Sequence, residues 1–188
     1  MLIVLGGTRK VDHLPTEIID LVRSYVEKGC VFYVGDAPGI DTAFQKLLQT
    51  LGTKKVSVCS SAEEVRNNLG SWKTEKIESP IKSKSHARHS IKDRFMTSKA
   101  DLGIMVWDSK SAGTLANVID LLEMNKESYM YNLIDQELIH FDTLKNLDGY
   151  LKGHREVQEE AVRRLHTYRS RSNRLSSKSF DQTNPQLF

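Results

Sequence analysis

Hydroxyl groups, a glycine and two charged side chains are gathered between Asp108 and Thr114, in the stretch Asp-Ser-Lys-Ser-Ala-Gly-Thr. The apolar segment 102–107 before it predicts a buried strand, and the periodicity of 114–125 after it predicts a helix. Such a turn leaves backbone N–H groups free at the beginning of a helix, where phosphate and other anions bind readily. The ligand contacts expected here are Asp108, Ser109, Ser111, Gly113, Thr114 and, further along the helix, Asn117.

Two other turns place glycine beside charged or hydroxyl side chains. Gly6-Gly7-Thr8-Arg9 follows the apolar run 1–5, and the second turn, 35–41, follows the apolar run 31–34. Glycine lets a backbone approach a ligand closely, and the arginine can pair with a phosphate. An aspartate of the second turn could accept ribose hydroxyls, although Asp41 could equally cap the next helix, and the first turn could be a plain one. The contacts expected here are Gly6, Gly7, Thr8, Arg9, Gly35, Asp36, Gly39 and Asp41.

A polar helix is predicted at 85–98. Arg88, Lys92 and Met96 are spaced four residues apart, so they share one face of that helix. From this face Arg88 and Lys92 could offer cations to a phosphate. The alternative is a charged helix that simply faces solvent.

Strands and helices alternate along the first 133 residues, which predicts a parallel sheet flanked by helices. Strands are predicted at 1–5, 31–34, 55–59, 102–107 and 128–133, and helices at 15–29, 40–51, 62–67 (short), 85–98 and 114–125. The expected fold class is α/β, a Rossmann-like three-layer sandwich with a mainly parallel central sheet. Because ligands bind at the carboxyl ends of the strands in such sheets, the three polar turns should lie together.

The pattern changes after residue 133. Asp135-Gln136 predicts a hairpin turn, and helices are expected at 143–152 and 154–168. The last stretch is rich in Ser, Arg, Asn and Gln and is expected to be disordered. The chain is therefore divided into a Rossmann-like domain with a C-terminal hairpin and helical appendage (1–152), a C-terminal helix (153–168) and a basic tail (169–188).

The composition is that of an ordinary globular protein: 188 residues, 39% hydrophobic, 27% charged, with a net charge of +3. No apolar run approaches the roughly 20 residues that span a bilayer, and the apolar start is too short for a signal peptide, so no membrane partner and a cytoplasmic location are expected. Two cysteines, Cys30 and Cys59, make neither a disulfide framework nor a metal site and should be buried. No cofactor is expected, because neither a Walker A motif nor a Gly-x-Gly-x-x-Gly fingerprint is present.

In these residues the sequence resembles the SLOG superfamily, the Rossmann-like group that contains the SMF/DprA proteins and the LOG phosphoribohydrolases, and it most resembles small stand-alone members of the YspA/YpsA-related type. The resemblance covers about residues 1–133. Besides the first two turns, it rests on Arg88, Lys92, Asp93 and Met96, and on Ala100-Asp101, Trp107-Asp108, Ser111 and Gly113-Thr114. It implies a nucleotide-derived ligand at the carboxyl edge of the sheet, and an oligomer, since SLOG proteins often dimerise.

The catalytic branch of the superfamily cleaves N-glycosidic bonds in nucleoside monophosphates and carries a Pro-Gly-Gly-x-Gly-Thr-x-x-Glu signature. In this chain Asn117 stands at the Glu position, and an amide cannot act as a general base or nucleophile. Asp36, Asp93 and Asp108 are the remaining candidates for a catalytic acid or base.

Three functions stay open from the sequence. The leading interpretation is a nucleotide-binding protein, for example a sensor of a nucleotide ligand. The second is a hydrolase or transferase that acts on the N-glycosidic bond of nucleoside monophosphates. The third is nucleic-acid binding, supported by the kinship with DprA and by the tail residues Arg169, Arg171, Arg174 and Lys178.

Overall fold

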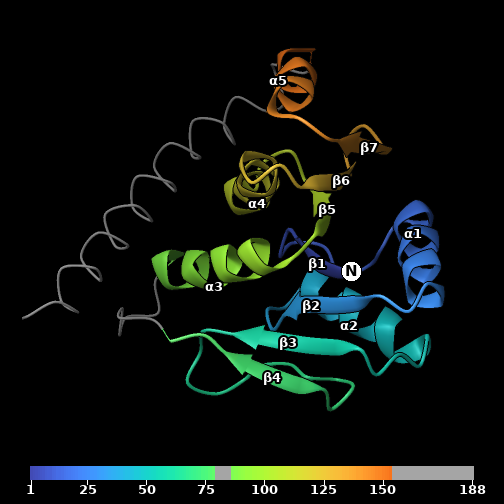
Figure 1. The fold of residues 1–188 in the computed structure, drawn as a ribbon, viewed down its shortest axis with the longest axis vertical. Coiled ribbons are helices and arrows are strands. Elements are labelled where there is room, and N and C mark those ends of the chain that lie inside the picture. The colour runs from blue at the N-terminus through green and yellow to red at the C-terminus, as the bar shows by residue number, and fades with distance from the viewer. Residues whose placement is uncertain (79–85, 154–188) are drawn as a thin grey trace, which may run out of the picture.

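The computed structural model of the chain describes residues 1–78 and 86–153, and in these it shows a single seven-stranded sheet (Figure 1). The order of the strands is β4-β3-β2-β1-β5-β6-β7, with every neighbouring pair parallel except the antiparallel β6 and β7. The strands are β1 (Leu2–Gly7), β2 (Val31–Gly35), β3 (Val56–Ser60), β4 (Lys73–Lys76), β5 (Leu102–Trp107), β6 (Glu127–Asn132) and β7 (Glu137–Phe141). The α/β fold class and the mainly parallel sheet predicted from the sequence are confirmed.

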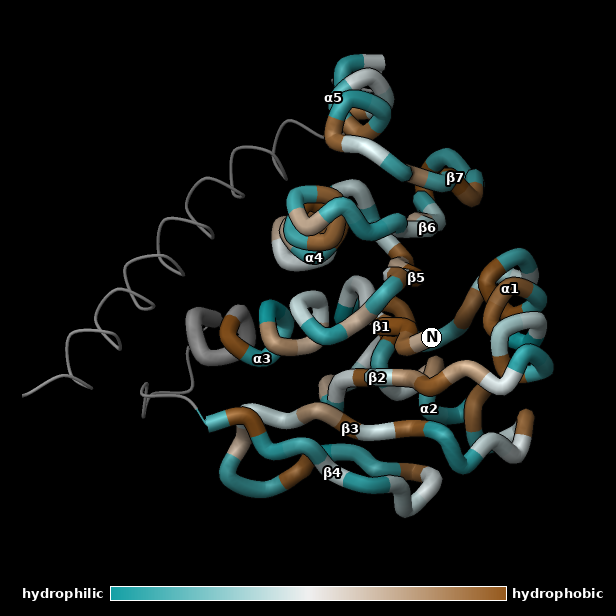
Figure 2. The backbone as a smooth tube through the Cα atoms, in the orientation of Figure 1, coloured by the Kyte–Doolittle hydropathy of each residue, from teal (hydrophilic) through white to brown (hydrophobic). Residues whose placement is uncertain are grey.

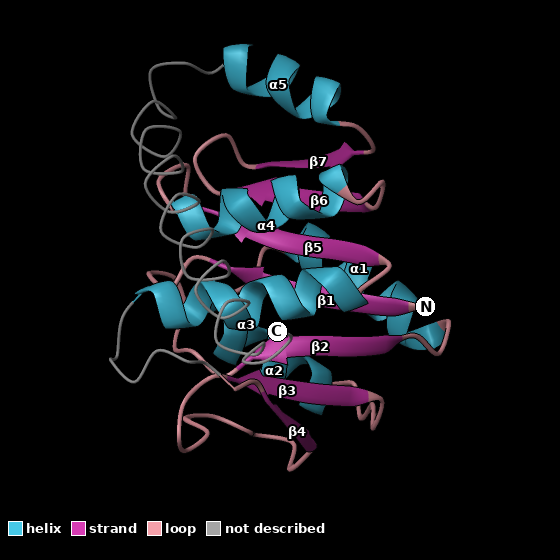
Figure 3. Ribbon diagram, turned by 60° about the vertical axis from the view of Figure 1, so that its left-hand side comes forward, coloured by secondary structure: helices cyan, strands magenta, loops and turns pink. Residues whose placement is uncertain are grey.

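Helices pack on the two faces of this sheet, as Figure 3 shows, with α3 and α4 in front of the sheet and α1 and α2 behind it, whereas α5 lies beyond the edge strand β7. The helices are α1 (Thr16–Glu27), α2 (Ile40–Thr50), α3 (His86–Lys99), α4 (Ala112–Glu123) and α5 (Leu144–Gly153). Their apolar sides bury two separate core clusters, one on each face. Helices therefore cover both faces of the sheet, and the ends of its strands are the place that remains for a ligand.

The strand β5 shows why the sequence folds this way. All six of its residues are buried, because helices cover the sheet on both sides. Ile104 and Val106 belong to the core under α1 and α2, whereas Met105 and Trp107 belong to the core under α3 and α4. In Figure 2 the hydrophobic colour accordingly runs through the central strands, while the edge strand β4 is hydrophilic.

The order of the strands changes direction at β1: β2 to β4 lie on one side of it and β5 to β7 on the other. From β1 the chain proceeds to β2, β3 and β4 on one side, and β5 then pairs with the other edge of β1, with Gly7 opposite Val106. The helices that follow β1 and β5 consequently lie on opposite faces. Such a reversal opens a crevice at the carboxyl ends of the two strands.

Residues 60–78 differ from the sequence prediction. The short helix expected at 62–67 was wrong: the structure has a loop there, followed by the strand β4, which the sequence did not reveal. Side chains of the loop, Arg66 and Asn67, bond to Asp36 instead of stabilising a helical turn. β4 escaped notice because Lys73–Lys76 is entirely polar, as suits an exposed sheet edge.

The hairpin and the helix at 143–152 were predicted correctly, as β6, β7 and α5. Both cysteines are buried and free, and burial raises the pKa of the Cys59 thiol to about 12. The helix expected at 154–168 and the tail 169–188 lie outside the described residues.

None of the helices in the described ranges is long and apolar enough to cross a membrane. Within those ranges no three His, Cys, Asp or Glu side chains are grouped so that they could hold a metal ion.

Candidate functional site

Two loops meet where β1 and β5 end. The Thr8 N–H donates to the Val106 carbonyl at 3.0 Å, and the Thr8 hydroxyl donates to Asp108 Oδ2 at 2.9 Å. The other carboxylate oxygen, Oδ1, accepts the backbone N–H groups of Lys110 (3.1 Å) and Ser111 (2.7 Å). Asp108 therefore shapes its own loop and fastens it to the loop after β1.

The beginning of α4 offers free donors at this point. Ser111 is the N-cap residue, but its hydroxyl caps no backbone N–H and instead accepts a 3.0 Å bond from the Thr114 hydroxyl. Within the described ranges, the N–H groups of Ala112, Gly113 and Thr114 have no hydrogen-bond acceptor. Three unpaired N–H groups at the positive end of a 12-residue helix form an environment that suits an anion.

The loop after β5 is also fixed from the other side. Ser109 has a left-handed backbone (φ 57°), and its buried hydroxyl donates to Asn132 Oδ1 at 2.9 Å. The Asn132 amide donates in turn to the Tyr150 hydroxyl (2.8 Å) and to Asp135 (2.7 Å). Asn132 and Tyr150 were not singled out in the sequence, because their contacts with the loop depend on how the appendage folds back.

The turn after β2 packs directly on the turn after β1. Gly39 has a φ of +84°, and a Cβ added to it would lie 2.6 Å from the Arg9 carbonyl oxygen. The Ile40 N–H donates to the Thr8 carbonyl at 3.2 Å. Two of the three predicted turns are thus one packed unit, while the Arg9 side chain is exposed, without a hydrogen bond or ion pair to any described residue.

Asp36, which follows β2, is fully buried, and its carboxylate is hydrogen-bonded. Its carboxylate accepts bonds from the Ser60 hydroxyl (2.7 Å) and from the Arg66 guanidinium (2.6 and 3.1 Å). Burial would raise the pKa of Asp36, but the hydrogen bonds from Arg66 and Ser60 outweigh it and lower that pKa. Asp36 therefore stays ionised and anchors the loop that carries Arg66, a residue the sequence analysis missed.

Lys92 reaches the same edge from α3 and is buried with carboxylates around it. Its Nζ lies 3.7 Å from Asp41 Oδ2 and 3.6 Å from Asp93 Oδ1. Burial would lower the pKa of Lys92, but these carboxylates and Asp36 raise it, so the ammonium stays charged. Burial raises the pKa of Asp41, against the opposing charge of Lys92. Asp41 also accepts the Ala37 N–H at 3.2 Å, which agrees with a local structural role.

The remaining candidates surround this centre. Gly6 and Gly7 end β1, and a Cβ on Gly7 would contact the Val106 backbone. Asn117 lies in the second turn of α4 and is half-buried. Arg88 lies in α3, but the position of its side chain is outside what the structure describes. α3 is not a solvated helix, because Lys92 and Met96 are buried.

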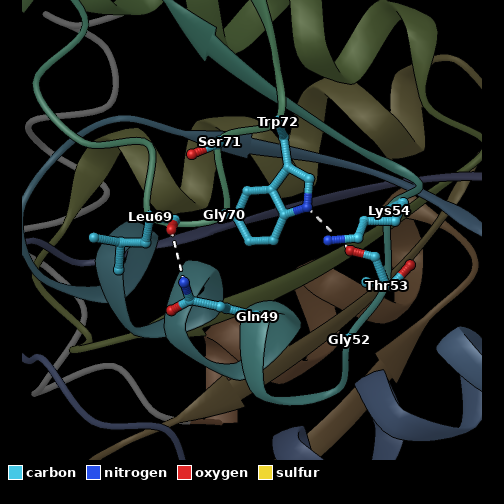
Figure 4. Close-up of a pocket in the computed structure, with 8 residues that line it drawn as sticks. All are labelled: Gln49, Gly52, Thr53, Lys54, Leu69, Gly70, Ser71 and Trp72. Carbon is cyan, nitrogen blue, oxygen red and sulfur yellow. Dashed lines mark hydrogen bonds between the residues drawn. The ribbon is translucent and has the colours of Figure 1, made fainter.

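A second hollow lies at the opposite edge of the sheet, near the amino end of β3 (Figure 4). It has a volume of about 160 Å³, and the Trp72 ring lies over the Gly70 backbone beside it, with its indole N–H donating to the Thr53 carbonyl at 3.0 Å. Gln49 closes one side through a 2.7 Å bond to the Leu69 carbonyl. Lys54 is the one charged residue among the eight drawn in Figure 4, and none of the eight belongs to the carboxyl edge.

No protein-family profile and no curated protein sequence matches the chain. Its fold is similar to a solved structure of DNA processing protein A from Helicobacter pylori, which gave insight into a unique single-stranded DNA binding mode. The TM-score is 0.51 at 18% sequence identity, and the match covers 89% of this chain and 81% of that chain. At this identity the likeness concerns the fold alone. What it identifies is the Rossmann-like α/β architecture that the chain shares with that structure.

Proposed function

We propose that the chain binds a nucleotide or nucleotide-derived ligand at the carboxyl edge of the sheet, with a phosphate at the beginning of α4. The observation that carries this proposal is the set of three N–H groups, of Ala112, Gly113 and Thr114, that have no acceptor among the described residues. They lie beside the Thr8–Asp108 bond, at the carboxyl ends of β1 and β5, where the strand order changes direction. Exposed Arg9, Lys10 and Lys110 add positive charge to the same two loops.

The proposal favours binding over turnover. Asn117 provides no carboxylate in the second turn of α4. Asp36 is buried and bonded to Arg66, and both oxygens of Asp108 accept hydrogen bonds, one within its own loop and the other from Thr8 in the loop after β1. We therefore infer a ligand-binding role, such as a sensor, rather than an N-glycosidase.

A thermal-shift screen with nucleoside mono-, di- and triphosphates, cyclic nucleotides and NAD-related compounds tests this role. A ligand at about 100 times its Kd adds roughly 2.7 kcal/mol of stability, which is readily seen. Each mixture is also chromatographed for released base. Stabilisation without released base is expected; released base would mean that the chain is an enzyme, and Asp93→Asn, Asp36→Asn and Asp108→Asn would then locate its acid or base.

One substitution tests the position of the phosphate directly. Ala112→Pro removes one of the three N–H groups, yet proline is favoured at the first position of a helix, and the extended backbone of Ser111 (φ −75°, ψ 103°) accepts a proline after it. The affinity should fall by about 10- to 100-fold, since a hydrogen bond to a charged group contributes about 1.5–3 kcal/mol. Ala112→Ser keeps the N–H and is the matched control. Equal affinity of the two variants would show that the phosphate lies elsewhere.

Binding of single-stranded nucleic acid is the second candidate, and the likeness to DNA processing protein A is the observation that favours it. Fluorescence anisotropy with a labelled single-stranded oligonucleotide, measured across salt concentrations, tests it. If the basic tail contributes, deletion of residues 169–188 should weaken binding and reduce its salt dependence. Unchanged affinity would exclude the tail as the binding element.

A further inference from the structure

The Lys92 side chain is largely buried, and its ammonium has no hydrogen bond to any described residue. The residue is 4% exposed, and its nearest carboxylate oxygens, on Asp41 and Asp93, are 3.7 and 3.6 Å away. Both distances exceed the range of an N–H···O bond, so the three N–H donors of Nζ have no acceptor in the described part of the chain. An oxygen atom that binds between Nζ and these carboxylates would supply the missing hydrogen bonds.

Gly35 makes room for this arrangement at the end of β2. A Cβ on Gly35 would lie 2.5 Å from Lys92 Nζ and would also meet the Asp41 carboxylate. Nζ is thus set directly over the backbone of the strand that adjoins β1. The phosphate-binding loop follows β5, on the other side of β1. One intervening strand, with a spacing of about 4.8 Å on each side, separates the two places.

A second unsatisfied group follows the neighbouring strand β3. The Ser61 hydroxyl is 2% exposed and has no hydrogen-bond partner in the described part of the chain. Cys59 pairs with Gly35 and faces the α3 side of the sheet, whereas Ser60 turns to Asp36 on the other side. Ser61 follows the carboxyl end of β3 directly, next to the Gly35–Cys59 pair over which Lys92 Nζ lies, so it is at the same edge of the sheet as Lys92.

We propose that Lys92, Asp41 and Ser61 form a subsite for a sugar hydroxyl of the phosphorylated ligand, which extends the proposed function and rests on it. A hydroxyl both accepts and donates, so it takes an N–H from Lys92 or the Ser61 hydroxyl proton and gives its own proton to Asp41. A second phosphate does not fit, because Asp41 and Asp93 already neutralise the ammonium. Asp36, the other acidic residue at the end of β2, is committed to Arg66.

The test uses probes without a base, because the base is unidentified. Ribose 5-phosphate carries both the phosphate and the hydroxyls, and tetrahydrofurfuryl phosphate has the same ring and phosphate without any ring hydroxyl. Titration calorimetry should show ribose 5-phosphate binding at least about tenfold more tightly, the effect of one hydrogen bond to a charged group. Equal affinity for the two probes would mean that a water molecule fills the gap, and the subsite would be rejected.

Ser61→Ala assigns the difference to this place in the fold. It removes a hydroxyl that has no partner among the described residues, so the free protein should be as stable as before or more stable. It should nevertheless weaken ribose 5-phosphate several-fold and leave tetrahydrofurfuryl phosphate unchanged, which a purely structural serine would not do. Ser57→Ala, within β3 and farther from the carboxyl edge, is the control and should change neither. An unchanged ribose 5-phosphate affinity in Ser61→Ala would overturn the assignment.

Ala112→Pro separates this subsite from the proposed function. It should weaken both probes by the same factor, because both carry the phosphate. If neither probe binds the wild-type chain, the phosphate site itself fails. If both bind equally and Ala112→Pro weakens both, the phosphate site stands and only the hydroxyl subsite fails.

Discussion

The Thr8 hydroxyl donates a 2.9 Å hydrogen bond to Asp108 across the boundary between β1 and β5, joining two loops whose residues are 100 positions apart. The loops lead to helices on opposite faces of the sheet. Thr8 is 2% exposed and Asp108 is half-buried, so this bond is partly shielded from water. The bond therefore holds the loop after β1 and the loop after β5 together beside the proposed phosphate site.

Thr8→Val should weaken the connection between these two loops. The substitution keeps the shape of the side chain but removes the donor, and the free energy of unfolding should fall by about 1–2 kcal/mol in urea titrations. Thr50→Val at the exposed end of α2, where the hydroxyl bonds to the Lys46 carbonyl, is the control and should change it by less than about 0.5 kcal/mol. If the free energy of unfolding fell equally in the two variants, the Thr8–Asp108 bond would contribute no more than an exposed hydrogen bond.

Arg66→Met should leave the Asp36 carboxylate buried without its cation and lower the free energy of unfolding by about 3 kcal/mol at pH 7. Adding Asp36→Asn should restore much of that loss, because the unpaired charge is then gone. The measurement is urea unfolding of both variants at pH 7. A double variant no more stable than Arg66→Met would contradict the pairing.

The same pair predicts a response to pH with a definite sign. The pKa of Asp36 in the folded wild type is lowered, so its contribution is present above the unfolded pKa of about 3.9 and is lost as the pH falls through the lower folded pKa. In Arg66→Met burial raises that pKa above 3.9, so acidification from pH 7 should recover part of the lost stability. Unfolding of both proteins between pH 7 and 3 shows whether the two trends diverge.

Tyr150→Phe should mobilise the loop after β5 from a distance. The substitution removes the hydroxyl that accepts from Asn132, the residue that holds Ser109 in its left-handed conformation. Hydrogen exchange of residues 109–114 should accelerate about fivefold, as expected for the loss of one hydrogen bond. Tyr131→Phe, which removes a tyrosine hydroxyl with no hydrogen bond to the described residues, should leave the exchange unchanged.

Gly70→Ala should displace the Trp72 ring from the hollow at the amino edge of the sheet. An added Cβ would overlap the indole, so overpacking should cost about 1–3 kcal/mol and shift the tryptophan fluorescence. Gly149→Ala makes the same change within α5, where nothing lies within 4 Å, and should stabilise the chain by up to about 1 kcal/mol. A neutral Gly70→Ala would mean that the indole moves aside freely.

The sequence predicted the framework of the site because its signals are local. A buried strand followed by glycine and by hydroxyl or charged residues is readable at each of the three turns, and the parallel order then brings their ends to one edge. The contacts that set the chemistry within that edge are not local. Asp36 meets Arg66 30 residues later, and Ser109 meets Asn132 23 residues later.

Besides these long-range contacts, the residue pattern did not reveal which polar side chains are buried. The helix with Lys92 looks polar in sequence, yet Lys92 lies beneath it, among carboxylates from α2 and α3. Ser61 is one of two adjacent serines, and only the structure distinguishes the bonded Ser60 from its unpartnered neighbour. Side chains on irregular loops such as 61–72 have no period from which their direction could be predicted.

The Gly39–Arg9 contact makes the chain a natural starting point for a biosensor. Because the Gly39 backbone lies against Arg9 and the Ile40 N–H is bonded to Thr8, the loop after β1 cannot shift without carrying the start of α2 with it. A fluorophore on the exposed residue 46, more than one helical turn along α2, would stay clear of the proposed site while being attached to the helix that is bonded to the loop. Occupancy could then be followed optically, before the identity of the natural ligand is known.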